Sequence, residues 1–465
     1  MEPGVTKIIW RGAIGHAIAA CILAGTGSAN AQEAAAKAGA LHPTFTIGGS
    51  VRGRTEGIDG QFRPKLDSRT AFVSFRTLVN AQVEMDGFLV GGELLDARGY
   101  GEGHNSSVKS TDVNTIEPLQ AYARYTAHGV FGAKDSLSAT AGRFTMTFGA
   151  QRLVARADFG NSFPSYLGAR IDYQTKARDQ LTLFWTHPMT ALPDTMDAIF
   201  DNKVQLDRVS ANVAFFGADG NVLSLAKRLS VGGYVYRLVE KDRPGVLTRD
   251  RRLVTVGLRS SLAAAKGRID FEVEAAIQHG RARATTAIGD RTDLTVRAGF
   301  VHAEMGYTLP LGWSPRVSAM FDYASGDGPN AAYGRFDSLF GARRADYGPV
   351  SLFGPVGLAN LVSPGARIEA KPSKRFDVML SARDLWLAER TDTFAFTAVR
   401  DRTGSVGRHA GTEFELRLRR TLIAKKLRLE MGAAYLAKGT FLNQAPNAAH
   451  HGDARYGYAD IVFNF

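Results

Sequence analysis

Hydrophobic and polar residues alternate with a period of two along most of this chain. In the segment GRIDFEVEAAIQ, Ile269, Phe271 and Val273 fall on one face, and Asp270 and Glu272 fall on the other. The segments TFTIGGSVRGRTEG, VSFRTLVNAQVE and TEFELRLR show the same alternation. Because successive side chains of a β-strand point to opposite faces, the pattern predicts strands with one apolar and one polar face.

The alternation continues to the last residue of the chain. Ile461, Phe463 and Phe465 share one face of the last predicted strand, and Tyr458 and Asp460 lie on the other. The closing strand of a transmembrane β-barrel is apolar outside, polar inside and ordered to its end. An edge strand of a soluble sheet gives the same pattern, so the ending alone leaves both interpretations open.

The connections between predicted strands alternate in length. The short turns MDG, TKARD, AAKG, LPLGW and KPSK are interspersed with long loops at 99–118, 187–207, 325–360 and 389–410. Short periplasmic turns and long extracellular loops are typical of outer-membrane barrels. We therefore predict an all-β fold, a single transmembrane antiparallel β-barrel of about 18 strands over residues 44–465.

The N-terminus predicts the compartment. A basic segment precedes an apolar stretch that is too short to span a bilayer as a helix, and Ala29-Asn30-Ala31 forms a small-x-small cleavage site. We expect residues 1–31 to be a removed secretory signal peptide and residues 32–43 to be a short periplasmic segment. A lipoprotein-type cleavage before Cys21 is the alternative. The predicted location is the bacterial outer membrane.

The amino-acid composition agrees with a barrel and shows that the protein is positively charged. No other segment has the roughly 18 consecutive apolar residues of a transmembrane helix. The chain has 50 glycines, 10% aromatic residues and a formal net charge of +12, and arginine supplies most of the basic residues. Arginine predominates where carboxylate or phosphate is recognised, although a G+C-rich genome also favours it. We expect no nucleic-acid partner and a monomer in contact with lipid and lipopolysaccharide.

Signals of catalysis and of cofactors are weak. Ser106-x-x-Lys109 and Ser224-x-x-Lys227 match a serine–lysine pattern without its companion motifs, so we expect no enzyme. We expect no cofactor either. The segment 322–330 (DYASGDGPN) carries oxygen ligands without the spacing of an EF-hand, which leaves calcium there as an alternative.

Charged residues recur on the polar face of successive predicted strands. By parity the inward arginines are Arg52, Arg54, Arg76, Arg124, Arg143, Arg170, Arg259, Arg316, Arg367, Arg383, Arg417 and Arg419. The inward acids are Asp172, Asp322, Glu369, Glu413 and Glu415. One interpretation is a lumen of mutually neutralising pairs. The functional interpretation is a guanidinium lining that lowers the barrier for anions.

Several motifs, in order along the chain, resemble the alginate export porins of the bacterial outer membrane. They are GRFTMTFGAQRLVARADFGNSFPSYLGARID, then FDYASGDG and RFDSLFGARRADYG, and finally GTEFELRLRRTL and LRLEMGAAYLAKGTFL. The resemblance implies an eighteen-stranded barrel whose arginine-lined pore is plugged by loops and passes a polyuronate. It places Arg143, Arg152, Arg170 and Asp172 on pore-lining stretches. One departure is Ala342-Arg343-Arg344, where the family usually has a histidine, which suggests a different ligand for that loop.

The predicted function is an outer-membrane channel for an anionic polysaccharide, alginate or a similar polyuronate, with periplasmic export proteins as partners. A general or small-anion uptake porin is the alternative, and a non-conducting adhesin is a third. The predicted pore lining consists of Arg52, Arg54, Arg76, Arg124, Arg143, Arg152, Arg170, Asp172, Asp322, Arg367, Arg383, Glu413 and Arg417.

Overall fold

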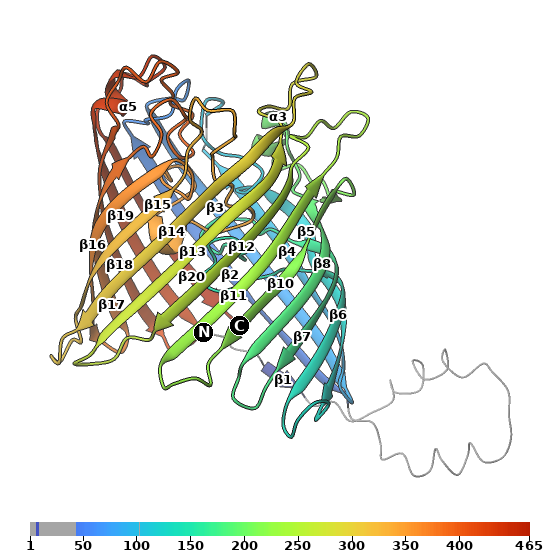
Figure 1. The fold of residues 1–465 in the computed structure, drawn as a ribbon. Coiled ribbons are helices and arrows are strands. Elements are labelled where there is room, and N and C mark those ends of the chain that lie inside the picture. The colour runs from blue at the N-terminus through green and yellow to red at the C-terminus, as the bar shows by residue number, and fades with distance from the viewer. Residues whose placement is uncertain (1–5, 9–42, 102) are drawn as a thin grey trace, which may run out of the picture.

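The chain forms one closed antiparallel β-barrel (Figure 1). Our computed structural model describes residues 6–8, 43–101 and 103–465. Eighteen strands form the wall, and each pairs with the next wall strand along the chain. The wall strands are β2 (Thr44–Asp59), β3 (Arg69–Met85), β4 (Phe88–Tyr100), β5 (Asn114–His128), β6 (Ser136–Phe144), β7 (Tyr166–Gln174), β8 (Gln180–Thr190), β10 (Val213–Val222), β11 (Leu229–Glu240), β12 (Arg252–Leu262), β13 (Ile269–Ala282), β14 (Leu294–Thr308), β15 (Arg316–Ala324), β16 (Leu361–Ser373), β17 (Phe376–Trp386), β18 (His409–Ile423), β19 (Leu427–Lys438) and β20 (Ala454–Asn464). The predicted barrel and its strand number are confirmed.

A few short elements accompany the wall. They are the strands β1 (Thr6–Ile8), which pairs with β2, and β9 (Arg208–Val209), which pairs with β8, and the helices α3 (Met196–Phe200), α4 (Arg344–Tyr347) and α5 (Thr440–Gln444). In the described part of the chain, no helix is long and apolar enough to cross a membrane. Apart from 6–8 and Pro43, the predicted signal peptide and the segment 32–43 lie outside the described residues.

The barrel closes between its first and last wall strands. β2 and β20 are paired from Ser50 opposite Asn464 to Asp59 opposite Arg455. The ladder extends one residue further, because Phe465 N–H donates to Gly49 O at 3.1 Å and Gly49 N–H donates to Phe465 O at 3.0 Å. The last residue of the chain is therefore part of the seam.

The two faces of the strands differ as the alternation predicts. On β13, the side chains of Ile269, Val273 and Ile277 are exposed on the outside, whereas Asp270 and Glu274 are buried inside. Exposed apolar residues continue around the outer wall, where lipid would cover them. The closed ladder thus directs the polar half of every strand into the lumen.

Loops and turns lie at opposite ends of the barrel (Figure 1). The predicted short turns connect strands at one end, and the long loops lie at the other. One long loop, residues 145–165 between β6 and β7, was not predicted as a loop. The loop cannot be recognised from the alternation pattern, because its apolar and charged residues do not recur at a regular interval.

We expect the last residue to be required for assembly. Deleting Phe465 removes both backbone hydrogen bonds to Gly49 and the ring beside it, whereas F465A keeps the backbone bonds. The deletion should therefore lower the folded fraction more than F465A does, measured as the heat-modifiable band on an unboiled gel. F131A removes an exposed aromatic ring from a turn and should assemble like the wild type. Equal assembly of all variants would contradict a role for the seam.

Candidate functional site

Two long loops enter the barrel and meet inside its lumen. The first, residues 145–165, connects β6 to β7, and the second, residues 325–360, connects β15 to β16. Phe340 N–H donates to Leu153 O at 2.9 Å, and Ala155 N–H donates to Phe340 O at 3.1 Å. Their buried apolar side chains include Leu153, Val154, Phe159, Phe336, Tyr347, Leu352, Phe353 and Val356. We call these segments the first and second inner loops; they pack as one unit.

Two arginines of the wall hold the first inner loop by its backbone. Arg52, on β2, donates to Asp158 O at 2.9 Å and to Gly160 O at 2.8 Å. Arg76, on β3, donates to the same oxygens at 3.1 and 3.0 Å, and its Nη2 lies 2.6 Å from Asp158 Oδ1. A guanidinium has five donors, so one side chain can satisfy several carbonyl groups that would otherwise be buried without partners.

A third arginine, Arg54, joins the same loop to the opposite side of the seam. It donates to Phe159 O at 2.6 Å, and its guanidinium lies 4.0 Å from the centre of the Phe159 ring. Its Nη2 also forms an ion pair with Asp460, on β20, at 2.6 Å. Both charged side chains of this pair are almost completely buried. Arg54 is thus part of the packed interior.

Arg143 and Arg152 are each surrounded by acids. Arg143 pairs with Glu117 and lies 2.8 Å from Asp207, which belongs to the loop after β8. Burial and the neighbouring Glu117 carboxylate raise the pKa of Asp207 to about 6. Arg152, in the first inner loop, contacts several carboxylates at 2.6 to 2.9 Å. These partners are Glu272 and Glu274 of β13 and Asp346 of the second inner loop.

Asp322 is the centre of a buried network beneath the second inner loop. Its carboxylate accepts hydrogen bonds from Tyr347 OH at 2.9 Å and from Arg383 at 2.6 Å, and it lies 2.7 Å from His302 Nδ1. Both oxygens are therefore engaged by the protein. In the described residues, no group of three or more His, Cys, Asp or Glu side chains is arranged to hold a metal ion.

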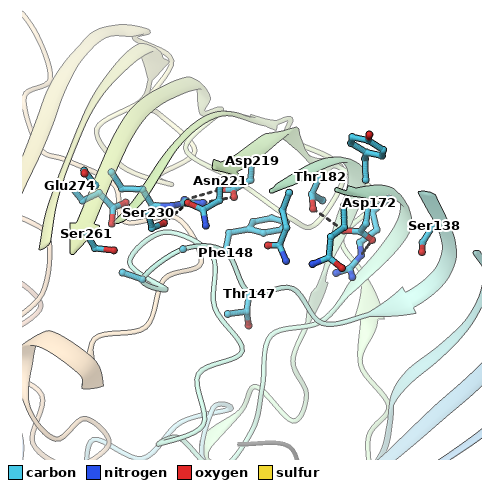
Figure 2. Close-up of a pocket in the computed structure, with 18 of the residues that line it drawn as sticks. Ser138, Thr147, Phe148, Asp172, Thr182, Asp219, Asn221, Ser230, Ser261 and Glu274 are labelled. Atoms are coloured by element: carbon cyan, nitrogen blue, oxygen red, sulfur yellow. Dashed lines mark hydrogen bonds and ion pairs between the residues drawn. The ribbon is translucent and has the colours of Figure 1, made fainter. Parts of the chain in front are cut away.

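A cavity of about 670 Å³ lies in the lumen near the short turns, beneath the first inner loop (Figure 2). Arg124, Arg170 and Asp172 line it together with Arg259 and many hydroxyl and amide side chains. Arg170 pairs with Asp172 at 2.8 Å. The Arg124 Nε donates to the hydroxyl of Thr140 at 3.1 Å, and no carboxylate of the described residues accepts a hydrogen bond from Arg124. The cavity is accordingly polar, with arginines and acids on its wall.

The remaining residues of the predicted pore lining lie on the wall strands β16 and β18, and Arg428 lies on the neighbouring strand β19. Arg367 lies 3.7 Å from Glu304. Glu413 is buried, and its Oε2 has no hydrogen-bond partner among the described residues. Arg417 and Arg428 are half-buried, and in the described part of the chain neither forms an ion pair. The guanidinium groups of both side chains thus have no carboxylate of the described residues within ion-pair distance.

Comparisons with known proteins agree with this architecture. The model of a family described as "Alginate export" matches residues 44–454. The chain belongs to the alginate export family.

Solved structures share the fold at low sequence identity. OpdQ of Pseudomonas aeruginosa is 11% identical with a TM-score of 0.53, and the match covers 90% of this chain and 97% of that chain. OccK9 (OpdG) and the outer membrane protein OpdK of the same organism are 12% and 10% identical, both with a TM-score of 0.55. Each match covers 90% of this chain and 98% of that chain. Among curated proteins, no sequence matches. The family and the fold indicate an outer-membrane channel rather than an enzyme.

Several charged residues of the lumen lie outside the predicted pore lining. Asp158, Arg156 and Arg344 lie in the inner loops, where strand parity gives no direction. Arg344 pairs with Glu415 of β18 at 2.7 Å, and Arg156 pairs with Glu93 of β4 at 2.8 Å. Arg428 shares the inward face of β19 with Glu430, so parity alone was sufficient to find it.

Breaking the buried pair between Arg54 and Asp460 should destabilise the barrel strongly. D460N leaves the Arg54 charge buried without its carboxylate, which typically costs about 3–5 kcal/mol. D59N removes the exposed partner of Arg69 and should cost about 0–1 kcal/mol. The free energy of unfolding in urea, followed by tryptophan fluorescence in lipid vesicles, measures both. An equal loss of unfolding free energy in D460N and D59N would show that the buried ion pair contributes no more to stability than the exposed one.

The loop after β8 should loosen as the pH rises. The pKa of Asp207 is about 6 in the folded state, whereas the ordinary value for aspartate is about 4. The folded state therefore binds this proton more tightly than the unfolded state, and the resulting stabilisation is lost as the pH rises from about 4 to about 6. Hydrogen exchange in residues 191–207, corrected for the intrinsic rate, should therefore increase across this interval. D207N should remove the dependence, and D194N, an exposed position in the same loop, should keep it. Unchanged pH dependence in D207N would exclude Asp207 as its source.

Proposed function

We propose that this barrel passes an anionic polysaccharide, alginate or a similar polyuronate, through a lumen lined by arginines. The observation that carries the proposal is a set of lumen arginines that have no ion-pair partner among the described residues. Among the described residues, no carboxylate lies within ion-pair distance of Arg124, Arg417 or Arg428. All three are half-buried side chains of wall strands. The family match and the formal charge of +12 support an anionic substrate.

Separate arginines suit a polymer that must keep moving. A polyuronate carries one carboxylate on each sugar, so several guanidinium groups can be engaged at once. At an effective dielectric of about 20, one charge pair at 4 Å is worth about 4 kcal/mol before desolvation. A single tight site would therefore hold the chain in place, whereas contacts spread along the lumen allow one pair to form as another breaks.

A small-anion or acidic-sugar uptake porin is the second candidate. It is favoured by the two inner loops, which fill part of the lumen with a packed apolar core and leave a cavity of about 670 Å³ beside the short turns. A cavity of this size suits a small ligand without movement of the loops.

Replacing lumen arginines should weaken both anion selectivity and polymer binding. The triple variant R124Q/R417Q/R428Q removes the three lumen charges that have no ion-pair partner among the described residues. We expect lower anion selectivity in planar bilayers and weaker block of small-anion current by added oligouronate. The difference from the wild type should shrink at high salt, because the interaction is screened.

The matched control is R178Q/R268Q/R291Q, which removes three exposed arginines from turns and a loop outside the lumen. It should keep the selectivity and the block of the wild type. Cation preference in the wild type would contradict both porin functions. Block of wild type by small acidic sugars but not by oligouronate would favour the uptake porin.

A further inference from the structure

The outer wall of the barrel carries a groove where strands β16 to β20 lie side by side (Figure 1). Its volume is about 570 Å³, and two rows of outward side chains form it. The first row consists of Ala366, Ala382, Phe414, Tyr435 and Arg455, and the second of Ile368, Leu380, Leu416 and Ala433. Within each row, every residue stands opposite the next one across a strand pair. The groove therefore runs across the strands rather than along one of them.

Small side chains make this part of the wall hollow. Ala366, Ala382 and Ala433 each present only a methyl group to the outside. Leu380 and Phe414, beside them, are large and about half exposed. Empty space next to these side chains would forfeit their dispersion contacts, so a flexible apolar chain that fits the hollow is a favourable occupant.

The first row ends at a positive charge. Arg455 is exposed, and the two acids nearest to it in the fold are already engaged. Asp59 accepts a hydrogen bond from Arg69 Nε at 2.9 Å, and Asp453 accepts one from Tyr435 OH at 2.6 Å. Among the described residues, no carboxylate lies within ion-pair distance of Arg455. Its guanidinium is therefore able to bind an anion from outside the chain.

The charged end lies close to the rim of the barrel, and the other end lies deeper in the wall. Arg455 directly follows the first residue of β20, at the end of the barrel that carries the long loops, whereas Ala366 lies near the middle of β16. Long loops of outer-membrane barrels face the cell exterior. Arginine and tyrosine side chains suit the level of the lipid headgroups, because each has an apolar body and a polar tip. The row thus leads from the headgroup level into the hydrocarbon.

We propose that this groove binds one acyl chain of a phosphorylated glycolipid of the outer leaflet, with a phosphate of the same lipid at Arg455. A guanidinium can donate two parallel hydrogen bonds to a phosphate, and the apolar rows below it bury the chain. Charge and hollow together match an amphipathic ligand whose polar group is anionic. The inference is independent of what passes through the lumen, because the groove lies on the opposite face of the wall.

The charge is tested with R455Q. The purified, unboiled full-length barrel in detergent is titrated with lipid A, the phosphorylated anchor of lipopolysaccharide, and bound lipid is counted by native mass spectrometry. R455Q should bind lipid A about fivefold more weakly than the wild type, the effect of one basic residue at an anionic lipid surface. Lipid A without its phosphates should bind R455Q and the wild type equally. The matched control is R297Q, which removes an exposed arginine of β14 near the same end of the barrel and should keep the affinity of the wild type.

The hollow is tested by filling it. A382F places a ring between the two rows and should weaken the binding of lipid A with and without phosphates. A275F adds the same ring to the exposed outer face of β13 and should leave binding unchanged. The heat-modifiable band on an unboiled gel verifies assembly, and A433L fills the groove from β19 if A382F does not assemble.

Three results would overturn the inference. Equal loss of affinity in R455Q and R297Q would show only a general attraction between a basic protein and an anionic lipid. Unchanged binding in both A382F and A433L would show that lipid A does not occupy the groove. A dimer of the wild type that becomes a monomer in A382F, with no change in lipid binding, would assign the groove to a second copy of the chain.

Discussion

The backbone ladder of the barrel must close, and the rest of the structure depends on this constraint. A bilayer offers no hydrogen-bond partners, so each N–H and C=O group of a membrane-spanning strand needs a partner on the next strand. The chain meets the requirement to its last residue, where Phe465 and Gly49 exchange two hydrogen bonds. Closure also fixes which face of every strand points into the barrel, because successive side chains along a strand point to opposite faces. The polar face of each strand is thereby placed in one enclosed lumen.

Loops that fold into that lumen create a second demand for hydrogen bonds. The backbone of residues 158–160 is irregular and has carbonyl groups that face the wall rather than a neighbouring strand. Arg52, Arg54 and Arg76 supply the donors, each to at least one of these carbonyls. A lysine has three donors around one point, whereas the planar guanidinium spans two neighbouring carbonyls. This requirement gives arginine a structural role that is separate from binding an anion.

Strand parity predicted the direction of the wall residues because it depends only on neighbouring positions. The inward side of β13 and the closing strand follow from the sequence alone. The role of each inward arginine does not, because it depends on partners far along the chain. Arg143 and Asp207 are 64 positions apart, and Arg152 and Asp346 are 194 positions apart. The first inner loop was missed for a related reason: its fold is set by contacts with distant strands and with the second inner loop, and no local period records them.

Burial separates the arginines that hold the structure from those that remain able to bind a ligand. An unpaired charge in a dry interior is costly, so the almost completely buried Arg54, Arg152 and Arg383 each have a carboxylate within ion-pair distance. Arg124, Arg417 and Arg428 have no such partner in the described part of the chain and are only half-buried. Contact with the water of the lumen makes an unpaired guanidinium tolerable at these positions. The same water is the medium through which an anion reaches them, so the physical condition that permits the free charge also makes it accessible to a ligand.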